Sequence, residues 1–103
     1  MDFSRFSYRE KEVLEKATDI LVRELAPSRI ILFGSRAKGT EFPGSDFDLG
    51  VDAARPTQDI EWKIQDGMDE ARGLYKVDVV YLKDVEADFR NLILRTGMVV
   101  YGS

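Results

Sequence analysis

Residues 46–52 place the strongest constraint on how this chain folds. The segment Asp46-Phe47-Asp48-Leu49-Gly50-Val51-Asp52 alternates strictly between polar or small residues and apolar ones. Successive side chains of a β-strand point to opposite faces, so this pattern predicts a strand with one buried apolar face. The opposite face carries acids and cannot be wholly packed in a core. We therefore expect a sheet with one face partly open where these acids lie.

Helical and strand patterns alternate along the rest of the chain. Apolar stripes at helical spacing predict three helices, over residues 7–25, 57–74 and 84–95. Short apolar or β-branched runs predict further strands, over residues 29–33, 77–82 and 98–101. This order predicts a small α/β (α+β) fold, in which a mixed sheet of three to four strands packs with helices.

Local signals place the ends of these helices. Ser7 and Glu10 have the spacing of a capping box at the start of the first helix. Asp84 is predicted to cap the last helix and Gly97 to end it. The apolar residues of that last helix are expected to be Phe89, Leu92, Ile93 and Leu94.

Cysteine and histidine are both absent from the 103 residues. Their absence excludes disulfides, thiolate zinc sites, Cys nucleophiles, Ser-His-Asp triads and imidazole metal sites. Any general base must then be a carboxylate, Lys or Tyr. Any metal site must use oxygen ligands, which favour Mg²⁺, Mn²⁺ or Ca²⁺.

The charge and hydropathy of the chain indicate where it works. A formal net charge of -4 is typical of a poor non-specific nucleic-acid binder, so we expect no direct nucleic-acid binding. The first residues lack the apolar segment of a signal peptide, and no apolar run approaches the ~20 residues of a membrane span. These features predict a cytoplasmic protein without membrane contact.

Residues 34–39 form a glycine-started turn that carries positive charge. The segment Gly34-Ser35-Arg36-Ala37-Lys38-Gly39 follows the predicted strand at 29–33 and has helical character after Ser35. Such a turn exposes backbone N–H groups that suit phosphate oxygens, and Ser35 adds a hydroxyl donor. Arg36 and Lys38 add positive charge. A glycine after a strand is more often only a turn, so this motif alone is a weak indication of phosphate binding.

Asp46 and Asp48 share one face of their strand, about 6.6 Å apart along it. Two carboxylates in this arrangement can chelate one Mg²⁺ or bridge two ions. The alternative is a solvated edge strand, which is the default for an isolated D-x-D pattern. Asp52 lies on the same face but about 20 Å from Asp46, and we interpret it as a strand-end residue.

Asp78 strengthens the functional interpretation of these acids. It lies inside an otherwise apolar run at 77–82, where a buried acid without partners would be costly. It must therefore lie at an exposed end of the sheet or in a charge-compensated cluster. If its strand lies beside residues 46–52, Asp78 can join a metal site or act as a base.

These motifs together resemble the DNA polymerase beta-like nucleotidyltransferase superfamily. The pattern is Gly34-Ser35, ten intervening residues, Asp46-x-Asp48 and a later Asp78 in a strand. The stretches FGSRAKG and SDFDLGVD resemble in particular the minimal nucleotidyltransferases of bacteria and archaea. The resemblance covers nearly the whole chain, and it implies the polymerase beta-like fold in a single domain of residues 1–103.

The resemblance also implies how the acids act. Asp46 and Asp48 would ligate two Mg²⁺ ions, for which Mn²⁺ can substitute. Asp78 would bind the second ion and help deprotonate the attacking hydroxyl. The implied reaction is in-line attack on the α-phosphorus of a nucleoside triphosphate, with pyrophosphate as leaving group.

The turn would bind the phosphates in this resemblance. Gly34 and Ser35 would hold the β- and γ-phosphates of ATP or another nucleoside triphosphate. Arg36 and Lys38 would neutralise the triphosphate. Lys38 stands where many relatives carry Arg, which would weaken bidentate phosphate contact.

Relatives of this size are usually found with a HEPN-domain protein, and the two form a toxin–antitoxin pair. The resemblance implies an antitoxin that transfers AMP from ATP to a Tyr hydroxyl of the HEPN toxin. Two alternatives stay open: a catalytically silent module that neutralises its partner by contact, and a transferase with a small-molecule acceptor.

Trp62 falls opposite the apolar stripe of the predicted helix at 57–74. An exposed Trp can anchor an interface, so one hypothesis places it in a homodimer or against the HEPN partner. The other hypothesis is that it folds back over its own helix. The acids on the same helix are interpreted as a solvated face.

Overall fold

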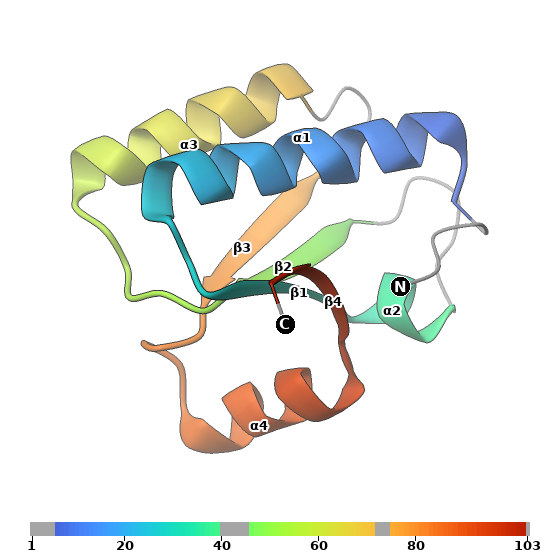
Figure 1. Ribbon diagram of the computed structural model, residues 1–103, viewed down its shortest axis with the longest axis vertical. Helices are drawn as coiled ribbons and strands as arrows, with labels where there is room; N and C mark the ends of the chain where they lie inside the picture. Colours follow the sequence, from blue (N-terminus) through green and yellow to red (C-terminus); the bar gives the residue numbers. More distant parts are fainter. Residues whose placement is uncertain (1–5, 40–45, 72–74, 103) are drawn as a thin grey trace.

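The protein is built around one four-stranded mixed β-sheet (Figure 1). The computed structural model describes residues 6–39, 46–71 and 75–102. The elements follow one another as α1 (Tyr8–Leu25), β1 (Arg29–Phe33), α2 (Ser35–Lys38), β2 (Phe47–Val51), α3 (Gln58–Ala71), β3 (Val77–Tyr81), α4 (Ala87–Thr96) and β4 (Met98–Gly102). The predicted fold class and the predicted order of elements are confirmed.

The strands lie in the order β3-β2-β1-β4. The first strand, β1, is antiparallel to both of its neighbours, β2 and β4. The pair of β2 and β3 is parallel, and α3 connects these two strands. This topology puts the end of β1 beside the beginnings of β2 and β3, where the predicted site residues lie.

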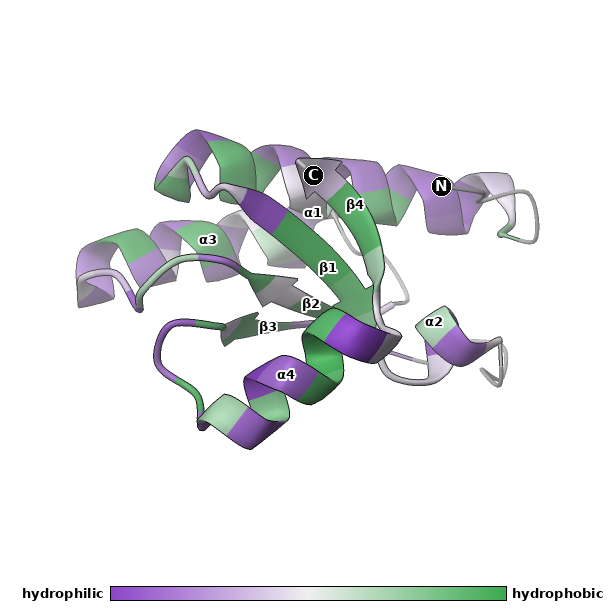
Figure 2. Ribbon diagram, turned by 60° about the horizontal axis from the view of Figure 1, so that its bottom comes forward, coloured by the Kyte–Doolittle hydropathy of each residue, from purple (hydrophilic) through white to green (hydrophobic). Residues whose placement is uncertain are grey.

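The two faces of the sheet are covered unequally. Helices α1 and α3 pack on one face, and α4 crosses the other face (Figures 1 and 2). The larger core lies under α1 and α3 and includes Phe47, Leu49 and Val51 of β2, all fully buried. A smaller core of Ile31, Leu82 and Ile93 lies under α4. The acidic face of β2 is therefore the α4 face, which is only partly covered.

The first helix begins as its sequence predicts. The Ser7 side chain accepts a hydrogen bond from the Glu10 backbone, and the Glu10 carboxylate accepts one from the Ser7 backbone at 2.8 Å. These reciprocal bonds satisfy backbone donors that the first helical turn leaves without partners. The helix ends at Leu25, and the C-cap residue Ala26 has a left-handed backbone (φ 45°) that turns the chain toward β1.

The last helix begins later than its sequence predicts. Its N-cap is Glu86, and Asp84 lies in the preceding turn, where its carboxylate accepts a hydrogen bond from the Arg55 backbone. The prediction that Asp84 caps this helix is therefore wrong, because its side chain is used by another loop. Ile93 is buried as expected, but Phe89 and Leu92 stay largely exposed, because α4 meets the sheet along a narrow stripe.

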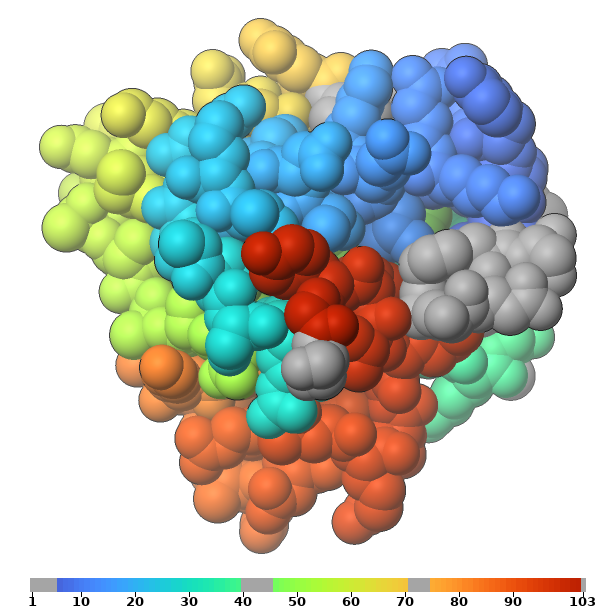
Figure 3. Space-filling view, viewed as in Figure 1, coloured from blue at the N-terminus to red at the C-terminus, as the bar shows by residue number. Residues whose placement is uncertain are grey.

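Figure 3 shows β4 at the molecular surface, between α1 and α4. The predicted end of the α3 helix near residue 74 lies outside the described residues. None of the described helices is both long enough and apolar enough to cross a membrane.

Candidate functional site

Three strands bring Asp78, Asp48 and Phe33 into one row. Asp48 of β2 is the register partner of Asp78 in β3 and of Phe33 in β1. Side chains of directly paired residues lie on the same face of a sheet, with strands about 4.8 Å apart. The row runs across the α4 face. Strand pairing thus unites two of the predicted acids that lie thirty positions apart in the sequence.

Asp48 is the electrostatic centre of this row. Burial raises the pKa of Asp48 above its ordinary value, and repulsion by the negative charges of Asp78 and Asp46 raises it further. Asp46 is exposed and directly precedes β2. Lys76 opposes the repulsion, since its ammonium lies 3.5 Å from an Asp78 carboxylate oxygen. Of the charged groups described around Asp48, two carboxylates therefore oppose its ionisation and the Lys76 ammonium favours it.

Gly34 brings the turn after β1 into direct contact with Asp48. Its backbone has a φ of 78°, a conformation that side-chain-bearing residues rarely adopt. A Cβ built at this position would lie 2.5 Å from Oδ2 of Asp48. The close approach requires a residue without a side chain. It places the predicted phosphate-binding turn against the predicted metal ligands.

Arg36 packs against Phe47, whose side chain lies on the face of β2 opposite to that of Asp48. The Arg36 side chain is completely buried and forms an ion pair with Glu10 of α1. The guanidinium carbon also lies 4.0 Å from the ring centroid of Phe47, in cation–π contact. The prediction that Arg36 neutralises a triphosphate does not match this placement. The side chain instead joins α1, α2 and β2 on the side of the sheet away from the acids.

Glu10 serves both its own helix and Arg36. Burial alone would raise the pKa of Glu10, but the hydrogen bonds from the Ser7 backbone and from Arg36 outweigh that effect and hold the pKa below its ordinary value. The carboxylate therefore stays ionised and keeps the buried guanidinium neutralised. This contact connects the N-terminal cap of α1 to the turn beside Asp48.

The remaining predicted phosphate contacts are close to the site in sequence. Ser35 is the first residue of α2 and is half-buried. Lys38 is the last residue of α2, is exposed, and donates its backbone N–H to the Gly34 carbonyl at 3.2 Å. Their roles toward a phosphate stay predictions.

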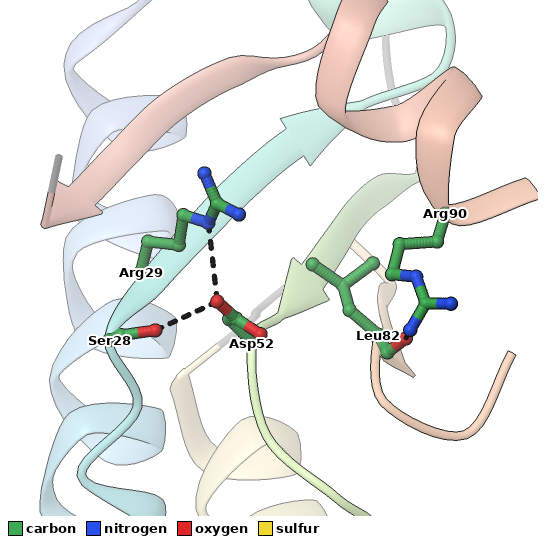
Figure 4. A network of polar contacts seen from close by, with 5 residues as sticks. All are labelled: Ser28, Arg29, Asp52, Leu82 and Arg90. Atoms are coloured by element: carbon green, nitrogen blue, oxygen red, sulfur yellow. Dashed lines mark hydrogen bonds and ion pairs between the residues drawn. The ribbon is translucent and has the colours of Figure 1, made fainter. Parts of the chain in front are cut away.

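Asp52 lies at the opposite end of β2 and has a structural role. Its carboxylate accepts hydrogen bonds from the Ser28 hydroxyl at 2.8 Å and from Arg29 at 3.3 Å (Figure 4). The hydrogen bond from Ser28 holds the pKa of Asp52 below its ordinary value, burial works against it, and the charge of Arg29 adds to the lowering. In the turn that follows β3, Arg90 of α4 donates a hydrogen bond to the Leu82 carbonyl at 3.4 Å (Figure 4). The interpretation of Asp52 as a strand-end residue agrees with this network.

The donor chemistry of the acid cluster fits a hard divalent cation. Carboxylate oxygens are the ligands that Mg²⁺ and Mn²⁺ prefer, and a bound cation would relieve the repulsion that raises the pKa of Asp48. Within residues 6–39, 46–71 and 75–102, no three acids are already arranged closely enough to hold a metal ion. Mg²⁺ is usually bound by one or two carboxylates together with water and substrate phosphates, so a pair of these acids would suffice as its protein ligands.

Two residues near the row were not identified from the sequence alone. Lys76 stands two positions before Asp78, and this spacing places both side chains on one face of a strand, so the signal was available. Phe89 contacts Phe33 with ring centroids 5.9 Å apart, and nothing local in the sequence indicates that contact.

Trp62 is 64% exposed on α3. It therefore projects outward as one of the two hypotheses requires. Whether it contacts another protein stays a prediction.

Comparisons with known proteins agree with this geometry. The family profile described as "Polymerase beta, Nucleotidyltransferase" matches residues 15–103. No curated protein matches the chain. The match spans the turn, all three acids and the whole sheet.

Solved structures are similar over most of the chain. A toxin–antitoxin crystal structure with AMP-PNP superposes with a TM-score of 0.72 at 25% identity, covering 86% of this chain and 73% of that one. A structure described as a minimal nucleotidyltransferase gives 0.69 at 22% identity, covering 92% and 97%. A variant of the toxin–antitoxin pair MntA-HpeT gives 0.68 at 21% identity, covering 86% and 72%.

Proposed function

Since the chain belongs to the polymerase beta nucleotidyltransferase family, we propose that it transfers a nucleoside monophosphate, AMP from ATP, to a hydroxyl acceptor. The acceptor in this proposal is a tyrosine of a HEPN-domain toxin, and the protein acts as its antitoxin. The proposed domain is the whole of residues 1–103.

The observation that carries the proposal is the contact between the turn and the row of acids. Gly34 lies against the Asp48 carboxylate, and Asp48 is paired with Asp78 on the same face. A triphosphate bound along this turn has its α-phosphorus next to the carboxylates. Phosphoryl transfer depends mainly on such positioning and on neutralising charge.

The proposed reaction balances without any further reactant. The acceptor hydroxyl oxygen forms a bond to the α-phosphorus, and the bond from that phosphorus to the bridging oxygen of the β-phosphate breaks. Pyrophosphate leaves with the bonding electrons. Asp78 helps to take the hydroxyl proton, and Gly34 and Ser35 hold the β- and γ-phosphates.

Asp46, Asp48 and Asp78 would hold the Mg²⁺ ions that this reaction uses. Bound Mg²⁺ would neutralise the charge of the phosphates and of the leaving group. Lys76, paired with Asp78, would have to give up part of that contact when the acids bind a cation.

Similarity to toxin–antitoxin structures supports the proposed partner. One of them was crystallised with AMP-PNP, a nucleotide of the class proposed as substrate. The open side of the acid row also suits a protein acceptor, because Asp78 lies on an outer strand of the sheet. A tyrosine on a partner surface can approach it without crossing another strand.

The proposal is tested by following the α-phosphate and the γ-phosphate of ATP separately. Purified protein and Mg²⁺ are added to lysate of the source organism with ATP labelled on either the α- or the γ-phosphate. A protein band labelled only from the α position is expected, and it should disappear in Asp48→Asn. Asp52→Asn changes the same strand at its other end and should keep the label.

Two results would contradict the proposal. Label from the γ position would indicate a kinase. Absence of label from both positions, together with capture of a partner that Asp48→Asn also neutralises, would establish the silent binding module instead.

A further inference from the structure

The acidic face of the sheet also carries an aromatic pair that the proposed reaction does not use. Phe33 is the register partner of Asp48, so its side chain lies next to the acids on the same face. Its ring meets that of Phe89 from α4 with centroids 5.9 Å apart and planes at 84°. The two rings are therefore packed edge to face beside the proposed reaction centre.

Phe89 is poorly buried for a large aromatic residue. It is 40% exposed, whereas Ile93, one turn later on the same helix, is 1% exposed. In an edge-to-face pair, the partner contacts at most one face of either ring, so further ring surface is left uncovered by the pairing itself. The pair thus combines a fixed position with accessible aromatic surface.

The aromatic pair adjoins the proposed phosphate-binding turn. Gly34 follows Phe33 directly and touches Asp48, so the turn, the carboxylate and the aromatic pair are neighbours. The other side of Asp48 is polar, because Asp78 and Lys76 form an ion pair there. A nucleotide with its phosphates on the turn and its acceptor near Asp78 would have its base on the Phe33 side.

We propose that Phe89 and Phe33 form a stacking subsite for the nucleobase of the bound nucleoside triphosphate. This inference rests on the proposed function and adds the part of the site that holds the base. Aromatic side chains stack on every base, since each base has a π-face. The subsite therefore requires a planar base and discriminates weakly between bases.

Calorimetric titration with two probes separates base binding from phosphate binding. ATP and inorganic tripolyphosphate are each titrated in Mg²⁺ into the wild type and into Phe89→Ala, Phe89→Leu and Phe89→Tyr. Loss of one stacking contact is expected to weaken ATP binding about tenfold in the Ala and Leu variants. Phe89→Tyr keeps the ring and should keep the affinity, and tripolyphosphate affinity should not change in any variant.

Leu92→Ala is the matched control on the same helix. Leu92 is 46% exposed, so its removal perturbs α4 to a similar degree without removing an aromatic ring. The affinity of the Leu92→Ala variant for ATP should equal that of the wild type. A second readout is the upfield shift of the adenine protons of ATP in ¹H NMR, expected with the wild type and lost in Phe89→Leu.

Each outcome has a distinct meaning. Unchanged ATP affinity in Phe89→Ala overturns the stacking subsite and leaves the proposed function standing. Equal weakening of ATP and tripolyphosphate also overturns it, because Phe89 would then act through the fold. If the wild type binds neither probe, the proposed function fails, and the subsite fails with it.

Discussion

Gly34 and Asp48 are packed so closely that no side chain fits between them. A Cβ at Gly34 would lie 2.5 Å from Oδ2 of Asp48, and the Gly34 backbone has a φ of 78°. The turn after β1 and the acidic face of β2 are thereby held in fixed relation. This contact between the turn and strand β2 brings the glycine motif and the acidic motif into one site.

We therefore expect Gly34→Ala to abolish ATP binding and to destabilise the fold by more than the backbone strain of about 1–3 kcal/mol, since its φ of 78° and ψ of -153° lie in a region that glycine alone readily adopts. Gly39→Ala is the matched control, since Gly39 has a φ of 77° and no described atom lies within 4 Å of a Cβ there. It should lose only the about 1–2 kcal/mol of a left-handed backbone, without a steric clash, and keep ATP binding. Urea denaturation and calorimetric titration measure the two effects. Equal loss in both variants would contradict the steric explanation.

Asp48→Asn should stabilise the metal-free protein. Burial and the charges of Asp78 and Asp46 raise the pKa of Asp48, so its ionised form is disfavoured in the folded state. Removing the charge should increase the free energy of unfolding by about 0.5 kcal/mol in EDTA at pH 7. Mg²⁺ should raise the melting temperature of the wild type and leave that of the variant unchanged. A lower melting temperature in EDTA would mean that the carboxylate is needed structurally.

Lys76→Met should have the opposite effect from Asp48→Asn. Lys76 lies 3.5 Å from Asp78 and supplies the attraction that offsets part of the repulsion among the acids. The side chain is 60% exposed, so the loss of stability in EDTA should be no more than a few tenths of a kcal/mol. Its removal should tighten Mg²⁺ binding, because the cation no longer competes with the ammonium. Weaker binding in a Mg²⁺ titration would contradict this competition.

Arg36→Met should destabilise the protein strongly. The substitution leaves Glu10, whose side chain is only 17% exposed, without its buried partner, which costs about 3 kcal/mol. Arg36→Lys keeps the charge but loses the planar contact with Phe47, so an intermediate loss is expected. A double-mutant cycle with Glu10→Gln, measured by urea denaturation, isolates the pair. Additive losses would mean that the two residues act separately.

The network around Asp52 predicts a dependence of stability on pH. The lowered pKa of Asp52 means that its contribution is fully present above the unfolded value near 3.8 and is lost as pH falls through the lower folded value. Asp52→Asn should therefore reduce stability at pH 7 and flatten the acid side of the stability curve. Ser28→Ala removes the hydrogen bond that contributes most to the shift and should reproduce part of the change. A curve for Asp52→Asn that parallels the wild type would contradict this assignment.

Much of the fold follows from local pattern. The alternation at 46–52 predicts which face of β2 is buried, and Ser7 with Glu10 predicts the first residue of α1. The start of α4 does not follow from local pattern, because the Asp84 carboxylate accepts a hydrogen bond from the backbone of Arg55, twenty-nine positions away. The local sequence cannot show whether the Asp84 carboxylate accepts a hydrogen bond from the helix that follows it or from the distant Arg55 backbone.

The sequence likewise predicts only part of the candidate site. Spacing alone indicates that Asp46 and Asp48 belong together, but only the parallel pairing of β2 with β3 places Asp78 beside Asp48. Arg36 shows that the position of a residue in a motif does not determine its contacts. Its position in a basic turn suggests a phosphate ligand, whereas aromatic rings and an acid from three other segments enclose it.

The parallel pairing of β2 with β3 also has a consequence for synthesis of the chain on the ribosome. The turn at Gly34 and the acids of β2 emerge first, and they can pair as an antiparallel hairpin-like unit of β1 and β2. Asp78 joins them only after the intervening helix α3 has been made and has brought β3 back alongside β2. A nascent chain that ends within α3 therefore carries two of the three acids in place. The row is completed late, by a contact between distant parts of the sequence, so a truncated product would lack the third acid even where its first strands had paired.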